Sequence, residues 1–277
     1  MRFASVLRNS EPLAVAVEGE TAVPLSGIAE LGAASGSDVL ADPPLDRDGA
    51  FPLSEATLRP VIPQPSKVIC VGLNYLAHVE ETKRDLPEYP VLFTKFATSL
   101  TGPRDPIPCP AESEAIDYEG ELAVVIGRRT RRVSRDRALG SVAGYTVADD
   151  VTMRDYQYKT HQWLQGKAWD ASTPLGPELV TPDEVGDPGT LRLRTLVNGE
   201  VVQDASTELL IFDIATLVSA ISEFATLLPG DVILTGTPSG VGFRREPPLL
   251  LGDGDTVVVE IDRVGRLENR FVSEPAG

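Results

Sequence analysis

Short runs of apolar and β-branched residues recur along the chain from Lys67 onward and predict strands. The runs are KVICVGLNY, ELAVVIG, GYTVADDV, LRLRTLVNGEVVQDAST, DVILTGT and DTVVVEID. In the fourth run, Asn198-Gly199 separates two strand-like halves and predicts a two-residue β-hairpin. Regularly spaced helices do not separate these runs, as they would in a doubly wound fold. The pattern therefore predicts a mixed, mostly β fold with a few helices.

One segment, FDIATLVSAISEFATLLPGD, has the periodicity of a helix. Asp213 can cap its first turn, and Pro229-Gly230 predicts its end. The apolar residues at helical spacing are Ile214, Leu217, Val218, Ile221, Phe224, Ala225 and Leu228. This face is expected to be core.

Residues 1–62 have a different pattern, in which short apolar runs are broken by Gly, Pro and Asp, as in GAASGSDVLADPPLDRDGA. They predict a small N-terminal β-rich domain. The stretch RPVIPQPSK is interpreted as a linker, and residues 63–277 as a second, larger domain, which carries the candidate chemistry described below. With 277 residues, of which 42% are hydrophobic, the chain is long enough to bury a large core.

Charge and cysteine content narrow the range of partners. The chain has 25 Lys and Arg against 41 Asp and Glu, a net charge of −16, so neither nucleic acid nor an anionic membrane is expected to bind. No apolar stretch approaches the roughly 20 residues that cross a bilayer, and no signal peptide is recognisable, so a cytoplasmic protein is expected. Cys70 and Cys109 form no CxxC pattern and are expected to be buried or incidental thiols.

Carboxylates cluster in DYEGELAVVIGR, which begins at residue 117. Residues two apart on a strand share a face, so Glu119 and Glu121 point the same way and Asp117 could join them. Such carboxylates repel one another unless they stay in solvent or a cation neutralises them. A solvated strand end is the alternative interpretation of this segment taken alone.

A second acidic pair, Asp149-Asp150, ends the run GYTVADD. If Asp150 joins Glu119 and Glu121, three oxygen ligands leave about half of an octahedral Mg²⁺ or Mn²⁺ shell open for water and substrate. Only two histidines occur and neither has a zinc spacing, so zinc is not expected. One of them, His161, is interpreted as structural or surface.

Three further segments carry candidate chemistry. Glu81 follows His78 by three residues, which suits a general base that activates water, although a surface His beside a Glu is commoner. Lys167 in GKAWDASTPLGP could bind a substrate carboxylate. The turn TGTPSGVG, residues 235–242, offers backbone amides such as that of Gly236, and the hydroxyl of Thr237, for anion binding. It lacks the P-loop and GxGxxG patterns, so no organic cofactor is expected; a tight structural turn is the alternative.

Seven motifs in order resemble the fumarylacetoacetate hydrolase family over roughly residues 67–263. They are GLNYLAHVEE, FTKFATSLTGP, DYEGELAVVIG, AGYTVADDVTMRD, QWLQGKAWDASTPLGP, VNGEVVQ and LTGTPSGVG. The segment FRREPPLLLGDGD further resembles one branch of this family. That branch contains the fumarylacetoacetate hydrolase domain-containing proteins and the bacterial 2-hydroxyhepta-2,4-diene-1,7-dioate isomerase homologues.

The resemblance implies a β-sandwich roll that forms a homodimer and binds Mg²⁺ or Mn²⁺, one ion per subunit. By position, the metal ligands fall on Glu119, Glu121 and Asp150, and the general-base dyad on His78 and Glu81 of a lid. The positions that contact substrate or act in catalysis fall on Arg154, Gln157, Lys167 and Thr237. Asp117 and Lys95 remain candidates to support the site.

Two departures from the family pattern affect the substrate. Leu73 stands in GLNY where many acylpyruvate hydrolases have arginine, and GKAWDASTPLGP replaces the frequent GKSFDTFCPLGP. The first hypothesis is a metal-dependent hydrolase that cleaves a C–C bond in acylpyruvate-type diketo acids during aromatic catabolism. The alternatives are an isomerase, tautomerase or decarboxylase of 2-oxo dicarboxylic acids and, from another class, a non-catalytic metal-binding homologue.

Overall fold

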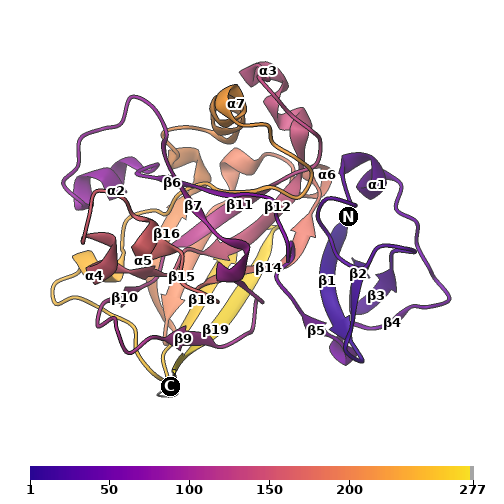
Figure 1. Ribbon diagram of the computed structural model, residues 1–277, viewed down its shortest axis with the longest axis horizontal. Coiled ribbons are helices and arrows are strands. Elements are labelled where there is room, and N and C mark those ends of the chain that lie inside the picture. Colours follow the sequence, from indigo (N-terminus) through magenta and orange to yellow (C-terminus); the bar gives the residue numbers. More distant parts are fainter. Residues whose placement is uncertain (275–277) are drawn as a thin grey trace.

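The computed structural model of the chain describes residues 1–274 and shows strands in two large sheets and one small one (Figure 1). The first sheet has the strand order β4-β3-β2-β1-β14-β12-β11-β17-β6-β7, with β5 beside β1 and β8 beside β14. The second has the order β16-β15-β18-β19-β9, and β10 pairs with β13. A mixed, mostly β fold is thereby confirmed.

The strands have the following bounds. In the first sheet they are β1 Arg2–Arg8, β2 Glu11–Glu18, β3 Thr21–Pro24, β4 Phe51–Pro52, β5 Thr57–Leu58, β6 Val68–Gly72, β7 Val91–Lys95, β8 Leu100–Thr101, β11 Gly120–Ile126, β12 Val142–Asp149, β14 Thr173–Val180 and β17 Val232–Leu234. The others are β9 Ile107–Cys109, β10 Ile116–Asp117, β13 Thr152–Met153, β15 Arg192–Val197, β16 Glu200–Ser206, β18 Thr256–Ile261 and β19 Gly265–Ser273.

The helices are short apart from one. They are α1 Ser37–Ala41, α2 Leu76–Glu81, α3 Arg135–Ala138, α4 Arg154–Gln157, α5 Leu164–Lys167, α6 Pro182–Val185 and α7 Ile214–Phe224. Single 3₁₀ turns lie at Leu53–Glu55, Ala97–Ser99, Leu139–Ser141, Pro188–Thr190, Thr207–Leu209 and Gly242–Arg244. No helix of the described residues is long and apolar enough to cross a membrane.

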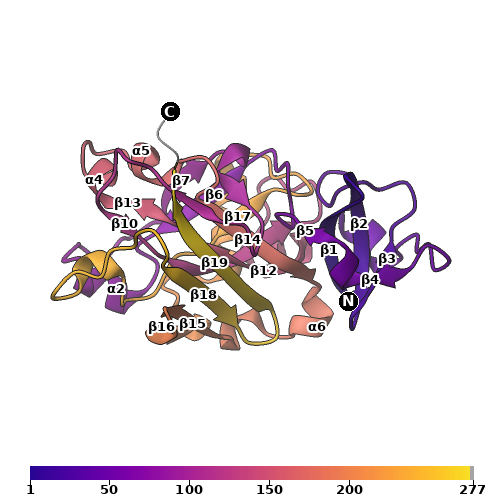
Figure 2. The same ribbon diagram turned by 90° about the horizontal axis from the view of Figure 1, so that it is seen from below.

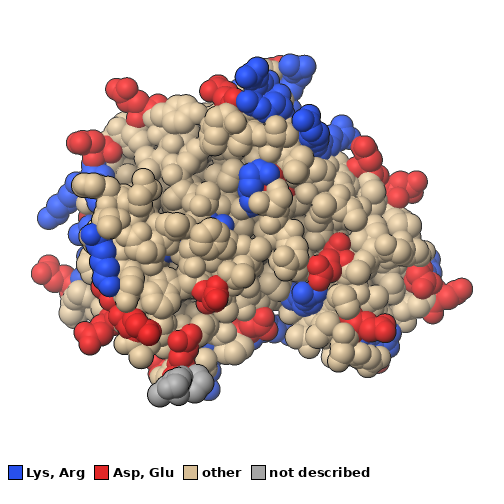
Figure 3. Space-filling view, in the orientation of Figure 1, with Lys and Arg blue, Asp and Glu red and all other residues tan. Residues whose placement is uncertain are grey.

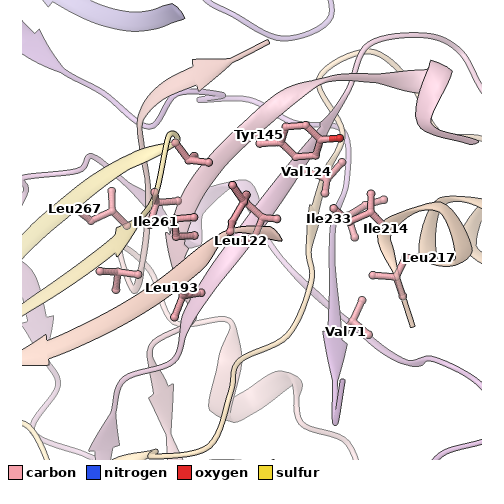
Figure 4. Close-up of a cluster of buried hydrophobic side chains, with 14 of the residues drawn as sticks. Val71, Leu122, Val124, Tyr145, Leu193, Ile214, Leu217, Ile233, Ile261 and Leu267 are labelled. Atoms are coloured by element: carbon pink, nitrogen blue, oxygen red, sulfur yellow. The ribbon is translucent and has the colours of Figure 1, made fainter. Parts of the chain in front are cut away.

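Strand β11 is buried on both faces, which explains its continuous apolar sequence. Leu122 and Val124 belong to a core cluster that also takes in residues of β15, β18, β19 and α7. Ala123 and Val125 belong to a second cluster on the opposite face of the sheet. Figure 4 shows the first cluster filling the space between the two large sheets and α7. The hairpin predicted from Asn198-Gly199 joins β15 to β16, with φ of 50° and 86° at its two turn residues.

Helix α7 begins where the sequence predicts, because the Asp213 side chain accepts a hydrogen bond from Thr216 N at 2.8 Å. It ends at Phe224, before the predicted stop at Pro229. The backbone of Leu227 instead exchanges two hydrogen bonds with Thr130, at 2.8 and 2.9 Å. This tertiary pairing draws the chain out of the helix before its apolar periodicity ends.

The N-terminal strands extend the first sheet instead of standing alone. Phe3 pairs with Leu179 of β14, and the stretch interpreted as a linker packs tightly, since Val61 and Ile62 are buried. A domain boundary at residue 62 stays a prediction. The strands β1–β5 lie at one end of the molecule, and α2, α4 and α5 lie at the other (Figure 2).

The exposed charges are unevenly distributed. Arginines of the segment 128–137 gather over α3, while the middle of the face seen in Figure 3 carries few charged side chains. The basic run RRTRR, residues 128–132, therefore belongs to one local patch on an acidic protein.

Candidate metal and substrate site

Three carboxylates from two neighbouring strands converge near α5. Ligand oxygens of Glu119, Glu121 and Asp150 all lie within 4.8 Å of one another. Gly120 of β11 pairs with Asp149 of β12, and Asp150 N donates to Glu119 O at 2.8 Å, so the strand register brings the acidic ends together. All three side chains are buried, so the alternative of a solvated strand end is wrong.

Buried cations surround these carboxylates. Lys95 Nζ lies 2.6 Å from Asp150 Oδ1, and Lys167 Nζ lies 2.6 Å from Glu119 Oε2 and 2.9 Å from Asp150 Oδ2. Arg154 Nη2 lies 2.7 Å from Glu119 Oε1 and 2.8 Å from Asp117 Oδ2. Asp117 therefore holds Arg154 and does not join the carboxylate cluster.

The cations act unequally on the carboxylates. Burial raises the pKa of Glu119, but Lys167 and Arg154 outweigh burial and hold the pKa below its ordinary value. Burial, then Asp150 and Glu119, raises the pKa of Glu121 well above its ordinary value. Burial would lower the pKa of Lys167, yet Asp150 and Glu119 outweigh it and raise this pKa, so the ammonium stays charged. Glu121 is thus the carboxylate that most needs another cation.

The charges of the site leave a place for a divalent ion. Five carboxylates and three cations are at least nine-tenths buried here: Asp117, Glu119, Glu121, Asp149 and Asp150 against Lys95, Arg154 and Lys167. The carboxylates thus outnumber the cations by two, and the raised pKa values of Glu121 and Asp149 identify the carboxylates that lack a cation. A divalent ion would favour their ionised forms, because buried charges require partners. The three converging oxygen ligands suit the hard cations Mg²⁺ and Mn²⁺. The residues therefore fit the metal that the sequence predicts.

The predicted dyad lies on α2. His78 Nδ1 lies 3.1 Å from Glu81 Oε2, and Glu81 Oε1 accepts a hydrogen bond from Gly240 N at 2.9 Å. Asn74 anchors the segment before α2, because its side chain bonds to Phe212 N and O and to Thr235 O. Glu81 consequently orients the imidazole and latches α2 to the turn at residues 235–242, called the glycine-rich turn below.

The glycine-rich turn binds carboxylates of the protein itself. Gly236 N donates to Glu121 Oε2 at 2.7 Å, and Gly242 N donates to Asp117 Oδ1 at 2.7 Å. The Thr237 hydroxyl donates to Gly120 O at 3.0 Å, which uses its only proton. The substrate-binding roles of Gly236 and Thr237 stay predictions, and in this structure both groups already have protein partners.

A cavity of about 40 Å³ opens beside the carboxylates. It is lined by Val71, Gly72, Leu73, His78, Thr82, Arg84, Glu119, Glu121, Arg154, Gln157, Tyr158, Trp163, Lys167 and Thr237. Gly72 has no space for a side chain, because a Cβ there would lie 2.3 Å from the Trp163 ring. Leu73 has a φ of 57°, in the left-handed region that disfavours branched side chains. Such strain is typical of functional sites.

Within the part of the chain that the structure describes, one cation of the cavity has no carboxylate partner and can meet a ligand. Arg154 and Lys167 are both paired with carboxylates, whereas Arg84 has no carboxylate partner among the described residues. Arg84 lies in the exposed loop after α2. Gln157, in α4, accepts from Arg154 Nη1 at 3.0 Å, so its amide NH₂ remains available.

The structure brings the predicted site residues together, and it shows that the two supporting candidates contact them, since Asp117 holds Arg154 and Lys95 holds Asp150. Sequence reasoning missed Arg84, Asn74 and Gln203, although the last two lie in the motifs GLNY and VNGEVVQ. His161 is exposed, Cys70 is buried and Cys109 is half-buried, and both thiols are free.

The family is shown by comparison with known proteins. The family model "Fumarylacetoacetate (FAA) hydrolase C-terminal" matches residues 67–272, and the chain belongs to this family.

Among its relatives, "Oxaloacetate tautomerase FAHD2A, mitochondrial" of Homo sapiens is 46% identical over 224 residues, which cover 80% of this chain and 71% of that protein. The 2-hydroxyhepta-2,4-diene-1,7-dioate isomerase of Mycobacterium marinum is 37% identical, with a TM-score of 0.85 over 100% of both chains. The fumarylacetoacetate hydrolase of Exiguobacterium antarcticum is 35% identical, with a TM-score of 0.87 over 99% of this chain and 100% of that one.

Proposed function

We propose that this enzyme of the fumarylacetoacetate hydrolase family is a divalent-metal-dependent keto–enol tautomerase of small 2-oxo dicarboxylic acids, of the oxaloacetate type. The observation that carries the proposal is the cavity, which is about 40 Å³ in volume and is lined by a buried carboxylate cluster, an imidazole and one arginine without a carboxylate partner among residues 1–274. That is space for about three or four waters at roughly 10–15 Å³ each, so the site favours small ligands over bulky ones. The names of the human relative and the mycobacterial isomerase support proton transfer over C–C cleavage.

Glu119, Glu121 and Asp150 would hold the metal. A bound Mg²⁺ or Mn²⁺ supplies a Lewis acid that polarises the carboxylate and keto oxygens of a 2-oxo acid. Lys95 and Lys167 hold the two oxygens of Asp150 from the protein side, at 2.6 and 2.9 Å. The orientation of this ligand is thereby fixed before any cation binds.

His78 is the proposed general base. Because Glu81 binds Nδ1, the other ring nitrogen, Nε2, is the one left to act on substrate. In the keto-to-enol direction the C3–H bond breaks and its proton goes to Nε2. The electron pair forms the C2=C3 double bond while the π pair of the C2=O bond moves onto the oxygen, and this enolate takes a proton from water to become the enol. In the reverse direction the imidazolium returns the proton to C3.

Lys167 is the proposed electrostatic stabiliser of the enolate. Its raised pKa means that the ammonium keeps its proton, so it contributes charge and not general-acid catalysis. A fixed positive charge at a buried position stabilises negative charge that develops on the keto oxygen.

Arg84 is the proposed partner of the second, distal carboxylate. It is the cavity cation without a carboxylate partner in the part of the chain described, and it comes from the segment that carries the dyad. A diacid would thus contact both the buried cluster and the loop after α2. This arrangement favours dicarboxylic over monocarboxylic 2-oxo acids.

The test uses protein stripped with chelator and restored with Mg²⁺ or Mn²⁺. The decay of enol-oxaloacetate absorbance is followed, while pyruvate and CO₂ are measured separately. We expect faster tautomerisation without either product, a loss of about 10²–10⁴-fold in His78→Ala, and no loss in the matched control His161→Ala. Release of CO₂ would identify a decarboxylase, and no turnover with intact metal binding a non-catalytic homologue.

Hydrolysis of a diketo acid is the second candidate. The geometry that favours it is the His78–Glu81 pair, which would serve equally well to activate water. Pyruvate released without CO₂ from fumarylpyruvate or acetylpyruvate would replace the tautomerase proposal with this one.

A further inference from the structure

Gln203 is a buried polar residue to which the proposed chemistry gives no role. It lies on β16 of the second sheet and is 1% exposed. It ends the motif VNGEVVQ, whose Asn-Gly explains the hairpin but leaves the glutamine unexplained. A buried amide is costly unless its donors and acceptor are all used.

The Gln203 side chain joins two segments of the site. Its Oε1 accepts from Gly120 N at 3.1 Å, and its Nε2 donates to Thr237 Oγ1 at 2.8 Å and to Pro238 O at 2.9 Å. Thr237 Oγ1 then donates to Gly120 O at 3.0 Å. The N–H of Gly120 is therefore bonded to Gln203, and the carbonyl of Gly120 is bonded to Thr237 of the glycine-rich turn.

Gly120 is the residue between the two metal-ligand glutamates. A Cβ at this position would lie 2.2 Å from Thr195 Oγ1 and 3.0 Å from Val259 Cγ1. Only glycine allows the second sheet to approach β11 closely enough for Gln203 to reach its backbone. The contact between the two sheets thus requires glycine at position 120 and a side chain with both an acceptor and a donor at position 203.

The glycine-rich turn connects the contact between Gln203 and Gly120 to helix α2 and to the proposed metal ligand Glu121. Gly236 N holds Glu121 at 2.7 Å, and Gly240 N holds Glu81 at 2.9 Å. The position of the turn relative to β11 therefore fixes two things together, the orientation of Glu121 and the docking of α2.

We infer that Gln203 is a positioning residue that sets the spacing between β11 and the glycine-rich turn, and so couples metal affinity to closure of the segment 76–90. The inference rests on the proposed metal site. It does not require that oxaloacetate be the substrate. Groups that orient metal ligands without touching the metal change affinity or activity about 10–100-fold when removed.

The test compares Gln203→Met, which keeps the length of the side chain and removes its hydrogen bonds, with the matched control Thr195→Val. Thr195 pairs with Gln203 across β15 and β16 and is also fully buried, but its hydroxyl has no hydrogen-bond partner among the described residues. Mn²⁺ affinity is measured by electron paramagnetic resonance, and protease cleavage within residues 76–90 is measured in metal-free protein.

For Gln203→Met we expect Mn²⁺ binding about 10–100-fold weaker and faster cleavage of residues 76–90, with native circular dichroism. Thr195→Val should match the wild type in both. If Gln203→Met does not fold, Gln203→Leu, which also removes the hydrogen bonds to Gly120, Thr237 and Pro238 and adds no charge, should show the same changes. Unchanged Mn²⁺ affinity and cleavage in a folded Gln203 variant overturn the inference. Because neither readout needs turnover, failure of the tautomerase proposal would be seen separately.

Discussion

Replacing Lys167 by methionine tests whether its ammonium acts on substrate or only supports the fold. The ammonium contacts Glu119 and Asp150 at 2.6 and 2.9 Å, and its side chain is 2% exposed. Removing one partner of a buried ion pair costs about 3–5 kcal/mol. Since Arg154 and Lys95 still pair with the two carboxylates, we expect the lower end, about 3 kcal/mol. At about 2–4 °C per kcal/mol, Tm falls by about 6–12 °C.

Lys95→Met is the matched control. Lys95 Nζ makes an equally buried contact with Asp150, at 2.6 Å, but does not line the cavity. Both variants should lose comparable stability in calorimetry with chelator present. At saturating Mg²⁺, which offsets weaker metal binding, kcat should fall about 100-fold or more in Lys167→Met and about tenfold or less in Lys95→Met. Equal losses of kcat in the two variants would refute the electrostatic role of Lys167.

Three further predictions follow from single contacts. Burial raises the pKa of Asp149 from 3.8 to about 7, so between these pH values the folded state holds a proton that the unfolded chain has lost. In urea unfolding of metal-free protein, the free energy of unfolding should therefore fall as pH rises from about 4 to about 7. Asp149→Asn should make this fall shallower, and an equally steep fall in that variant would contradict the assignment. In Gly240→Ala, the added Cβ would lie 2.2 Å from Val202 O, and residue 240 has a φ of 102°. The turn must therefore move, α2 loses the contact between Gly240 N and Glu81, and we expect kcat to drop about tenfold or more. A wild-type kcat would contradict the role of this contact. Arg84→Gln should raise KM for oxaloacetate about tenfold or more. It should not change inhibition by oxalate, which has no distal carboxylate, and Lys83→Gln should change neither quantity. Equal effects of the two variants would reject the role of Arg84.

Local rules predicted the parts of the site that lie on one strand or one helix. Glu119 and Glu121 share a face because side chains alternate along a strand, and His78 meets Glu81 because residues three apart are neighbours on a helix. Asp150 was harder to assign, because its place depends on the register between β11 and β12. The resemblance to the family supplied that step.

Tertiary contacts produced what the sequence did not predict. Lys95 and Asp150, which form an ion pair, are 55 residues apart in the sequence, so no local sequence pattern predicts their contact. The early end of α7 comes from the backbone bridge to Thr130, which competes with a helical periodicity that continues to Leu228. Similarly, the amides of the glycine-rich turn were assigned to substrate because nothing in the sequence shows that Glu121 and Glu81 reach them first.

The distinction between tautomerase and hydrolase lies in the space beside the dyad more than in the dyad itself. An imidazole oriented by a carboxylate can accept a proton from carbon or from water. For hydrolysis the cavity must hold an acyl chain and an attacking water together with the 2-oxo acid, and about 40 Å³ leaves little space for all three. The latch from Glu81 to Gly240 keeps α2 against this cavity and limits its enlargement for a longer substrate. Docking of α2 would thus favour proton transfer over cleavage, and the substrate range should depend on Leu73 and Arg84 at the cavity wall while the carboxylate cluster stays the same.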